Sequence, residues 1–398
     1  MYETVALLAI ALLIYGAVAG AIERSWSSAP IVFMGVGVVL GPLMLDVLHL
    51  TVTVRDLQGL AELTLAMVLF ADAAHADLGE IRRNWRVPGR LLLVGLPLTI
   101  VLGGVIALIL FPNLALLEIA LLTAILAPTD AALGAPVIAN PHVPNTVRQS
   151  LNFESGLNDG ICVPVVLILL GYATGVQVEH GTVAHVTLVV VEEIGIGALT
   201  GLGLTFAGAR LLVFSHKRGW ISPHWIDIPV LAKAAACFAA AQALGGSGFI
   251  ACFVGGLLLS TYPKPKQDLL RGAETAGQIL SMLTWVTFGW GVVPMILRNW
   301  NATIVLYALL SLTVIRMAPV YLSLRGTGID PLSRLFIGWF GPRGLASVVF
   351  AIIVLHEKLP GNETMMVVIG TTVMLSVLLH GMSATPLSAW IGGRQRTA

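Results

Sequence analysis

Charged residues are scarce in this sequence. Lys, Arg, Asp and Glu make up 11% of its 398 residues, whereas 57% are hydrophobic, and the mean hydropathy is +0.90. A soluble domain is excluded, because water would have to cover far more apolar surface than one core could bury. The sequence therefore predicts an all-α polytopic membrane protein in contact with membrane lipid. Its formal net charge of +1 gives no indication of a nucleic-acid partner, and none is expected.

Cysteine is nearly absent. The three cysteines, Cys162, Cys237 and Cys252, fall inside apolar runs, so neither a disulfide framework nor a zinc-binding spacing is present. We expect them to be small buried hydrophobes. The sequence also lacks an HExxH motif and a glycine-flanked pair of catalytic aspartates, which a membrane hydrolase would need. We predict that the protein is not an enzyme and needs no cofactor.

The apolar residues form runs of about 20 residues, each long enough to cross a hydrocarbon core of about 30 Å. The sequence predicts about 13 transmembrane helices, although the pair at 226–262, divided only by Gly245 to Gly248, could be a single helix. The runs are 5–22, 30–48, 57–76, 91–111, 115–139, 148–173, 184–213, 226–244, 247–262, 272–297, 302–324, 331–355 and 364–390.

The basic residues in the loops predict the orientation. With 13 helices, 16 of the 22 basic residues fall in loops on the side of the C-terminus, and three fall on the other side. Cytoplasmic loops carry the excess of Lys and Arg, so the N-terminus is expected outside and the C-terminus in the cytoplasm. The 16 residues are Arg24, Arg82, Arg83, Arg86, Arg90, Arg148, Arg210, Lys217, Arg218, Lys264, Lys266, Arg271, Arg325, Arg334, Arg394 and Arg396.

Polar residues interrupt the apolar pattern between positions 121 and 164. Pro128, Thr129 and Asp130 divide the fifth run, and Glu154, Ser155, Asn158 and Asp159 lie in the sixth. Ionisable groups at membrane depth are costly to bury, so they mark an ion or proton pathway. The four-residue spacings of Glu154 with Asn158 and of Ser155 with Asp159 place two adjacent stripes on one helix. Their oxygen atoms suit a small hard cation.

A second interruption lies in the twelfth run, where Gly341, Pro342 and Gly344 surround Arg343. A proline in mid-helix frees backbone groups that neighbours must satisfy. If the seventh helix is a linker, the first six and last six helices form two inverted repeats, in which broken helices 5 and 12 correspond and cross. Paired broken helices in an inverted repeat indicate a transporter site at the midplane. Asp130 is placed to offset the positive helix ends there, and Arg343 the negative ends.

Three motifs, Thr129-Asp130, FESGLNDG at 153–160 and GPRGLAS at 341–347, resemble the cation/proton antiporter family. The resemblance is to its NhaP-like branch of sodium/proton exchangers with an Asn-Asp pair in the sixth helix. It implies an elevator-type homodimer in a bacterial or archaeal plasma membrane. The moving core would be helices 4–6 (91–173) and 11–13 (302–390). The dimer scaffold would be 1–76 and 226–297, with 184–213 as the linker.

The resemblance also implies that Asp159 binds Na⁺ or H⁺, with Thr129, Ser155 and Glu154 assisting. Glu154 could instead form a structural ion pair with Arg343 or another basic group, and Asn158 could support packing between helices. If Asp159 alone exchanges its occupant, only the filled site is neutral enough to cross a low-dielectric barrier. This predicts obligatory one-for-one exchange that moves no net charge.

Two other classes of membrane protein compete with an antiporter as interpretations of this sequence. An ion channel would need a ring of filter residues or pore helices, which two broken helices bearing an acid and an arginine do not suggest. A proton- or sodium-coupled solute symporter could use a similar inverted repeat. An organic substrate normally requires a roomier site, whereas the polar cluster here is compact.

Overall fold

The structure is a computed structural model, and it describes residues 2–22, 25, 27–49, 54–76, 79, 85–175, 183–225, 227–262 and 266–395. Throughout these residues the regular structure is helical, with no strand. The helices are α1 (Tyr2–Ile22), α2 (Ala29–Leu40), α3 (Val54–His75), α5 (Arg86–Arg90), α6 (Leu96–Leu110), α7 (Leu116–Ile125), α8 (Ala131–Ile138), α9 (Asn145–Gly175), α10 (Val183–Lys217), α11 (Ile228–Ala243), α12 (Gly248–Ser260), α13 (Lys266–Thr287), α14 (Val293–Asn299), α15 (Ala302–Leu312), α16 (Val314–Ser323), α17 (Pro331–Trp339), α18 (Leu345–His356) and α19 (Asn362–Gln395). Short π-helical turns, η1 (Leu91–Gly95) and η3 (Phe288–Val292), continue into α6 and α14, and η2 (Pro223–Trp225) is a 3₁₀ turn.

The all-α polytopic class is confirmed. In the described part of the chain, seven segments are long and apolar enough to cross a membrane by length and composition. The 13 spans and the inverted repeats stay predictions. Of the basic residues that predict the orientation, Arg24, Arg82, Arg83, Lys264 and Arg396 lie outside the described residues.

The chain divides into two compact units. The first comprises residues 1–58, 86–155 and 282–398, and the second comprises 59–85 and 156–281. Helices α3, α9 and α13 each contribute to both units.

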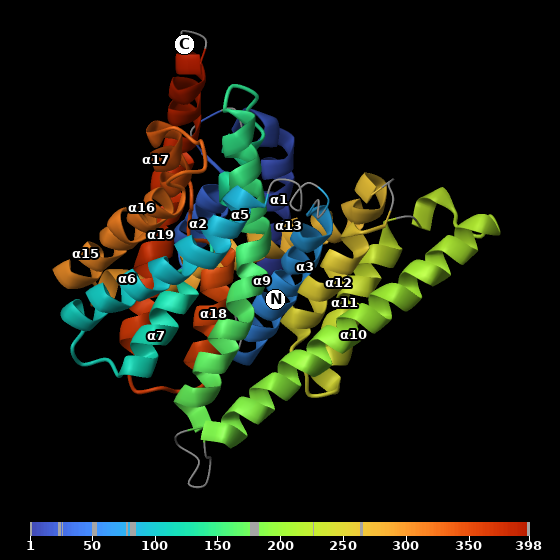
Figure 1. The fold of residues 1–398 in the computed structure, drawn as a ribbon, viewed down its shortest axis with the longest axis horizontal. Coiled ribbons are helices and arrows are strands. Elements are labelled where there is room, and N and C mark those ends of the chain that lie inside the picture. The colour runs from blue at the N-terminus through green and yellow to red at the C-terminus, as the bar shows by residue number, and fades with distance from the viewer. Residues whose placement is uncertain are drawn as a thin grey trace. The chain divides into compact units, whose positions relative to one another are not determined.

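Small residues allow the helices of the second unit to pack closely. Helices α10, α11 and α12 lie side by side (Figure 1), and a Cβ on Gly201 of α10 would overlap the carbonyl of Ala251. Cys237 and Cys252 are buried in the core between these helices and α3, and all three cysteines are buried, as expected. Gly245, at φ +77°, turns the chain between α11 and α12, so the pair at 226–262 is two helices.

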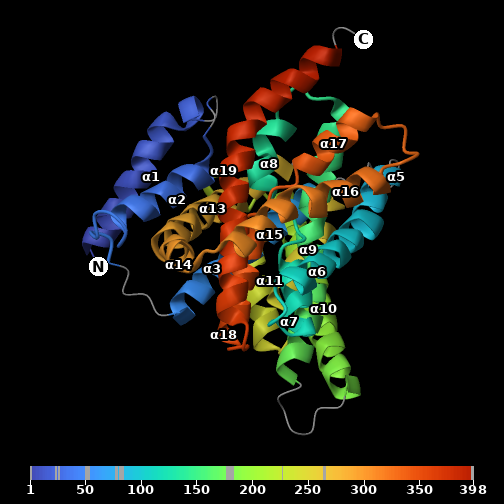
Figure 2. The ribbon, with the colours of Figure 1, turned by 90° about the vertical axis from the view of Figure 1, so that its left-hand side faces the viewer.

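The first unit contains both interrupted runs. Helix α19 lies beside α8, and α16 beside α17 (Figure 2). Their buried apolar side chains form a core with the start of α9, and its members include Val137, Leu151, Val320, Phe336 and Ala384.

Two expected spans differ from the structure. The run 30–48 is helical only to Leu40, because Gly41 and Pro42 end the helix. The amides of Val47 and Leu48 then donate hydrogen bonds to the carbonyl of Leu40. The run 302–324 is divided at Thr313, where φ is −110° and ψ is −92°. This division places Arg316 in the first turn of α16.

Candidate functional site

The first break lies between α7 and α8. Helix α7 ends at Ile125, and α8 begins at Ala131 after a segment that contains Pro128. Asp130 is the N-cap of α8, and its Oδ1 accepts hydrogen bonds from the amides of Ala132 at 2.8 Å and Leu133 at 3.1 Å. A carboxylate at this position satisfies free amides and interacts favourably with the positive end of the helix.

The second break lies between α17 and α18 and contacts the first. Helix α17 ends at Trp339, and α18 begins at Leu345. The second carboxylate oxygen of Asp130, Oδ2, accepts from the amide of Leu345 at 2.8 Å. The amide of Asp130 donates to the carbonyl of Pro342, also at 2.8 Å. One carboxylate therefore caps the N-termini of both half-helices.

Arg343 contacts the start of the first break, just after the end of α7, whereas Asp130 lies at its other end. The side chain of Arg343 is fully buried, and Nη1 donates to the carbonyls of Ala127 at 2.8 Å and Pro128 at 3.2 Å. These carbonyls follow the C-terminal end of α7, where a cation interacts favourably with the helix dipole. The hydroxyl of Ser347 donates to the carbonyl of Ile125 at 2.7 Å. Asp130 and Arg343 thus occupy the positions that charge compensation requires, and the energetic weight of that compensation stays a prediction.

Two glycines make room for the charged side chains. A Cβ on Gly344 would overlap the carboxylate of Asp130, and a Cβ on Gly341 would overlap the guanidinium of Arg316. Neither obstacle can move without breaking buried hydrogen bonds.

We expect Gly344→Ala to destabilise the protein by about 1–3 kcal/mol, because it displaces Asp130 from both half-helices. Thermal unfolding in detergent measures the effect. The matched control is Gly104→Ala in α6, where an added Cβ meets no atom within 4 Å. Equal melting temperatures for the two variants would contradict the cap assigned to Asp130.

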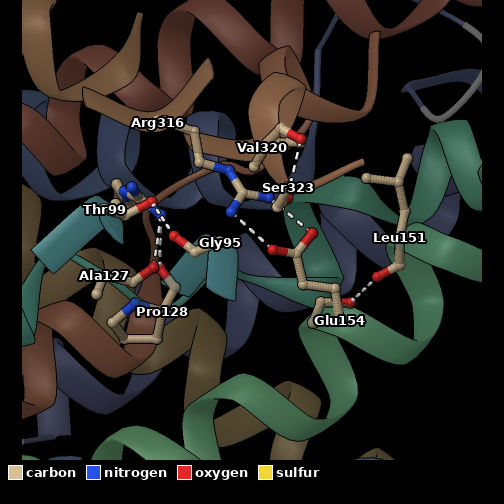
Figure 3. Close-up of polar contacts among 11 residues, drawn as sticks. Gly95, Thr99, Ala127, Pro128, Leu151, Glu154, Arg316, Val320 and Ser323 are labelled. Atoms are coloured by element: carbon tan, nitrogen blue, oxygen red, sulfur yellow. Dashed lines mark hydrogen bonds and ion pairs between the residues drawn. The ribbon is translucent and has the colours of Figure 1, made fainter. Parts of the chain in front are cut away.

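Glu154 is held by Arg316. Nη1 of Arg316 donates to Oε1 at 2.6 Å and Nη2 to Oε2 at 2.7 Å, so both carboxylate oxygens are engaged (Figure 3). The two side chains are 2% and 1% exposed. A bidentate pair of this kind is strong and geometrically specific. Glu154 therefore forms a structural ion pair, and its partner is Arg316 and not Arg343.

The remaining predicted residues lie in or near these elements. Thr129 is buried in the first break, and Ser155 is buried on α9, where its hydroxyl donates to the carbonyl of Leu151 at 2.8 Å. Asn158 and Asp159 are buried on the part of α9 that belongs to the second unit, and Asp159 lies one turn beyond Ser155 on the same helix.

Among the described residues, no group of three or more His, Cys, Asp or Glu side chains could hold a metal ion. The predicted Na⁺ ligands Asp159, Ser155 and Thr129 are a different set, with one carboxylate and two hydroxyls, and their ligation stays a prediction.

Three residues join this network that the sequence did not single out for the site. Arg316 pairs with Glu154, Ser376 accepts from the amide of Arg343 at 2.7 Å, and His380 contacts Ser376 and the carbonyl of Trp339. The available signal for Arg316 and His380 was an ionisable residue inside an apolar run. Ser376 carried no such signal.

The chain is similar to known proteins in sequence and in fold. A family model described as "Sodium/hydrogen exchanger, transmembrane" matches residues 7–390. The structure is similar to that of the sodium proton antiporter MjNhaP1 from Methanocaldococcus jannaschii, with a TM-score of 0.76, 20% identity, and coverage of 98% of this chain and 99% of that one.

The sequence is also similar to proteins that are named as antiporters. A K(+)/H(+) antiporter NhaP2 from Shewanella sp. (strain ANA-3) is 27% identical over 334 residues, which are 82% of this chain and 56% of the relative. A Na(+)/H(+) antiporter from Schizosaccharomyces pombe is 24% identical over 313 residues, 71% of this chain and 66% of the relative. The chain spans little more than half the length of the NhaP2 relatives that it matches.

Two interrupted helices that meet inside a helical membrane protein are typical of secondary transporters. The chain belongs to the sodium/hydrogen exchanger family.

Proposed function

We propose that this protein is an antiporter that exchanges one monovalent cation for one proton. The observation that carries the proposal is the junction of the two breaks, where Asp130 caps two half-helices and Arg343 faces the end of α7. This arrangement keeps unwound backbone stable at membrane depth, which is what a transporter site requires. The membership of the family supports the same reaction and does not favour the solute symporter.

Asp159 is the exchanging carboxylate in this proposal. Both oxygens of Asp130 accept from main-chain amides, and both oxygens of Glu154 accept from Arg316. A carboxylate engaged in this way supports the fold, and protonating it would weaken the hydrogen bonds that it accepts. Asp159 is buried on the helix that also carries Ser155, and Ser155 and Thr129 would supply further oxygen ligands.

The transported cation is Na⁺ or K⁺. Oxygen ligands bind both ions, and the relatives include antiporters named for either one. We propose further that the protein is a homodimer that moves its ion-carrying core like an elevator, with helices 4–6 and 11–13 as that core.

We expect exchange in sealed proteoliposomes to be insensitive to membrane potential. A trapped pH dye should report proton efflux when Na⁺ or K⁺ is added outside, at equal rates at zero and at −100 mV. If each cycle moved one net charge, a potential of 100 mV would change the driving force by about 2.3 kcal/mol. The final ion concentration gradient would then change by about 50-fold.

Protein-free liposomes give the background rate in this assay. A rate that follows the voltage would contradict one-for-one exchange. The absence of a pH signal with Na⁺, Li⁺ and K⁺ would contradict antiport itself.

A further inference from the structure

Two residues of α19 contact the second break through hydrogen bonds. His380 and Ser376, one turn apart on α19, are 1% and 0% exposed. They face the segment between Trp339 and Arg343, and none of the functions above uses His380.

His380 holds the end of α17. Its Nε2 lies 2.7 Å from the carbonyl oxygen of Trp339, the last residue of α17. A carbonyl oxygen can only accept, so the ring donates to Trp339 in the tautomer that carries its proton on Nε2. The C-terminal carbonyls of a helix have no donor within the helix, and the imidazole supplies one.

Ser376 holds the main chain of the break. Its Oγ accepts from the amide of Arg343 at 2.7 Å and lies 3.3 Å from Nδ1 of His380. Nδ1 also lies 2.9 Å from the carbonyl of Ser376. The ring and the hydroxyl therefore form one connected set of contacts, and the two residues together fix both ends of the unwound segment.

The position of Arg343 depends on this segment. Its main chain is held by Ser376, and its side chain reaches Ala127 and Pro128 of the first break. The preceding residue, Pro342, accepts from the amide of Asp130. A shift of residues 340–344 would therefore displace the partners of both compensating charges.

We propose that His380 is a positioning residue for ion exchange: with Ser376, it clamps the second break so that Arg343 and Pro342 meet the first break. The role in exchange rests on the antiport proposed above. His380 touches neither the cation nor the exchanging carboxylate in this proposal, and it acts through the backbone of the break.

Two substitutions separate the hydrogen bonds of His380 from its packing. The ring stacks on the indole of Trp339, with centroids 4.9 Å apart and planes at 26°. His380→Phe keeps an aromatic ring and loses the donor to Trp339. His380→Gln loses the ring and keeps a side-chain N–H that can reach the same carbonyl.

We expect His380→Gln to retain exchange within about twofold of the wild type and His380→Phe to lose about tenfold, because a buried carbonyl is left without its donor. His356→Phe, a histidine replacement at an exposed position of α18, is the control and should be neutral. The opposite ranking, with His380→Phe active and His380→Gln impaired, would show that packing against Trp339 is the role of the residue and would overturn the proposal.

A double substitution tests the connection with Ser376. If the two residues act as one clamp, His380→Phe combined with Ser376→Ala should be no slower than the slower single variant. Independent effects would multiply, and multiplied effects would overturn the proposal.

Hydrogen–deuterium exchange tests the clamp without measuring transport. A peptide that covers residues 340–345 should exchange faster in Ser376→Ala and His380→Phe than in the wild type, while His380→Gln stays protected. Unchanged protection in all three would overturn the clamp. A wild-type protein with no cation-triggered proton movement would instead refute antiport and leave this measurement to decide the clamp.

Discussion

Asp159→Asn should abolish cation-triggered proton movement. Asparagine has the shape of aspartate, so it can occupy the buried position on α9, but it carries no charge and exchanges no proton. We expect a rate at least about 100-fold below that of the wild type, a difference of about 2.7 kcal/mol. Proteoliposomes with a trapped pH dye, tested with Na⁺, Li⁺ and K⁺ in turn, measure it.

Asn158→Ala on the same helix is the control for this experiment. Asn158 is buried like Asp159, and an amide side chain between helices supports packing. We therefore expect Asn158→Ala to lower thermal stability and to retain exchange. Normal exchange by Asp159→Asn would remove Asp159 from the site, and Glu154 would then be the carboxylate to test.

The sequence was sufficient to predict the class of fold and both breaks. Apolar runs indicate membrane helices, and Pro128 with Asp130 and Pro342 with Arg343 mark the two places where such runs cannot continue as helix. The length of α2 and the division at Thr313 were missed. Hydropathy reports composition along the chain, whereas a helix ends where the main chain turns, and Thr313 is neither proline nor glycine. Its conformation depends on tertiary packing.

The pairing of charges could not be predicted from one sequence. Glu154 and Arg316 are 162 positions apart, and a basic residue in an apolar run has several acidic residues as possible partners. Sequence reasoning could assign Asp130 and Arg343 to the breaks because each lies within its own break. Contacts of His380 with Trp339, 41 positions away, similarly depend on how α17 packs against α19.

The buried pair of Glu154 and Arg316 leads to the second large effect. Both side chains are almost fully buried, and each is the other's partner through two hydrogen bonds. Removal of one charge leaves the other buried without compensation. We expect Arg316→Met to destabilise the protein by about 3–5 kcal/mol, measured by thermal or denaturant unfolding in detergent. The same replacement at the exposed Arg298 is the control, and a surface charge contributes at most about 1 kcal/mol.

The double variant Glu154→Leu/Arg316→Met separates the stability of the pair from a role in transport. Replacing both members with apolar side chains removes the uncompensated charge, so most of the lost stability should return. If Glu154 is a structural partner of Arg316, this variant should still exchange cations for protons. If Glu154 also ligates the cation, the variant should be stable but inactive. Unfolding of Arg316→Met at the wild-type temperature would contradict the buried ion pair, because removal of Arg316 must leave the charge of Glu154 buried without a partner.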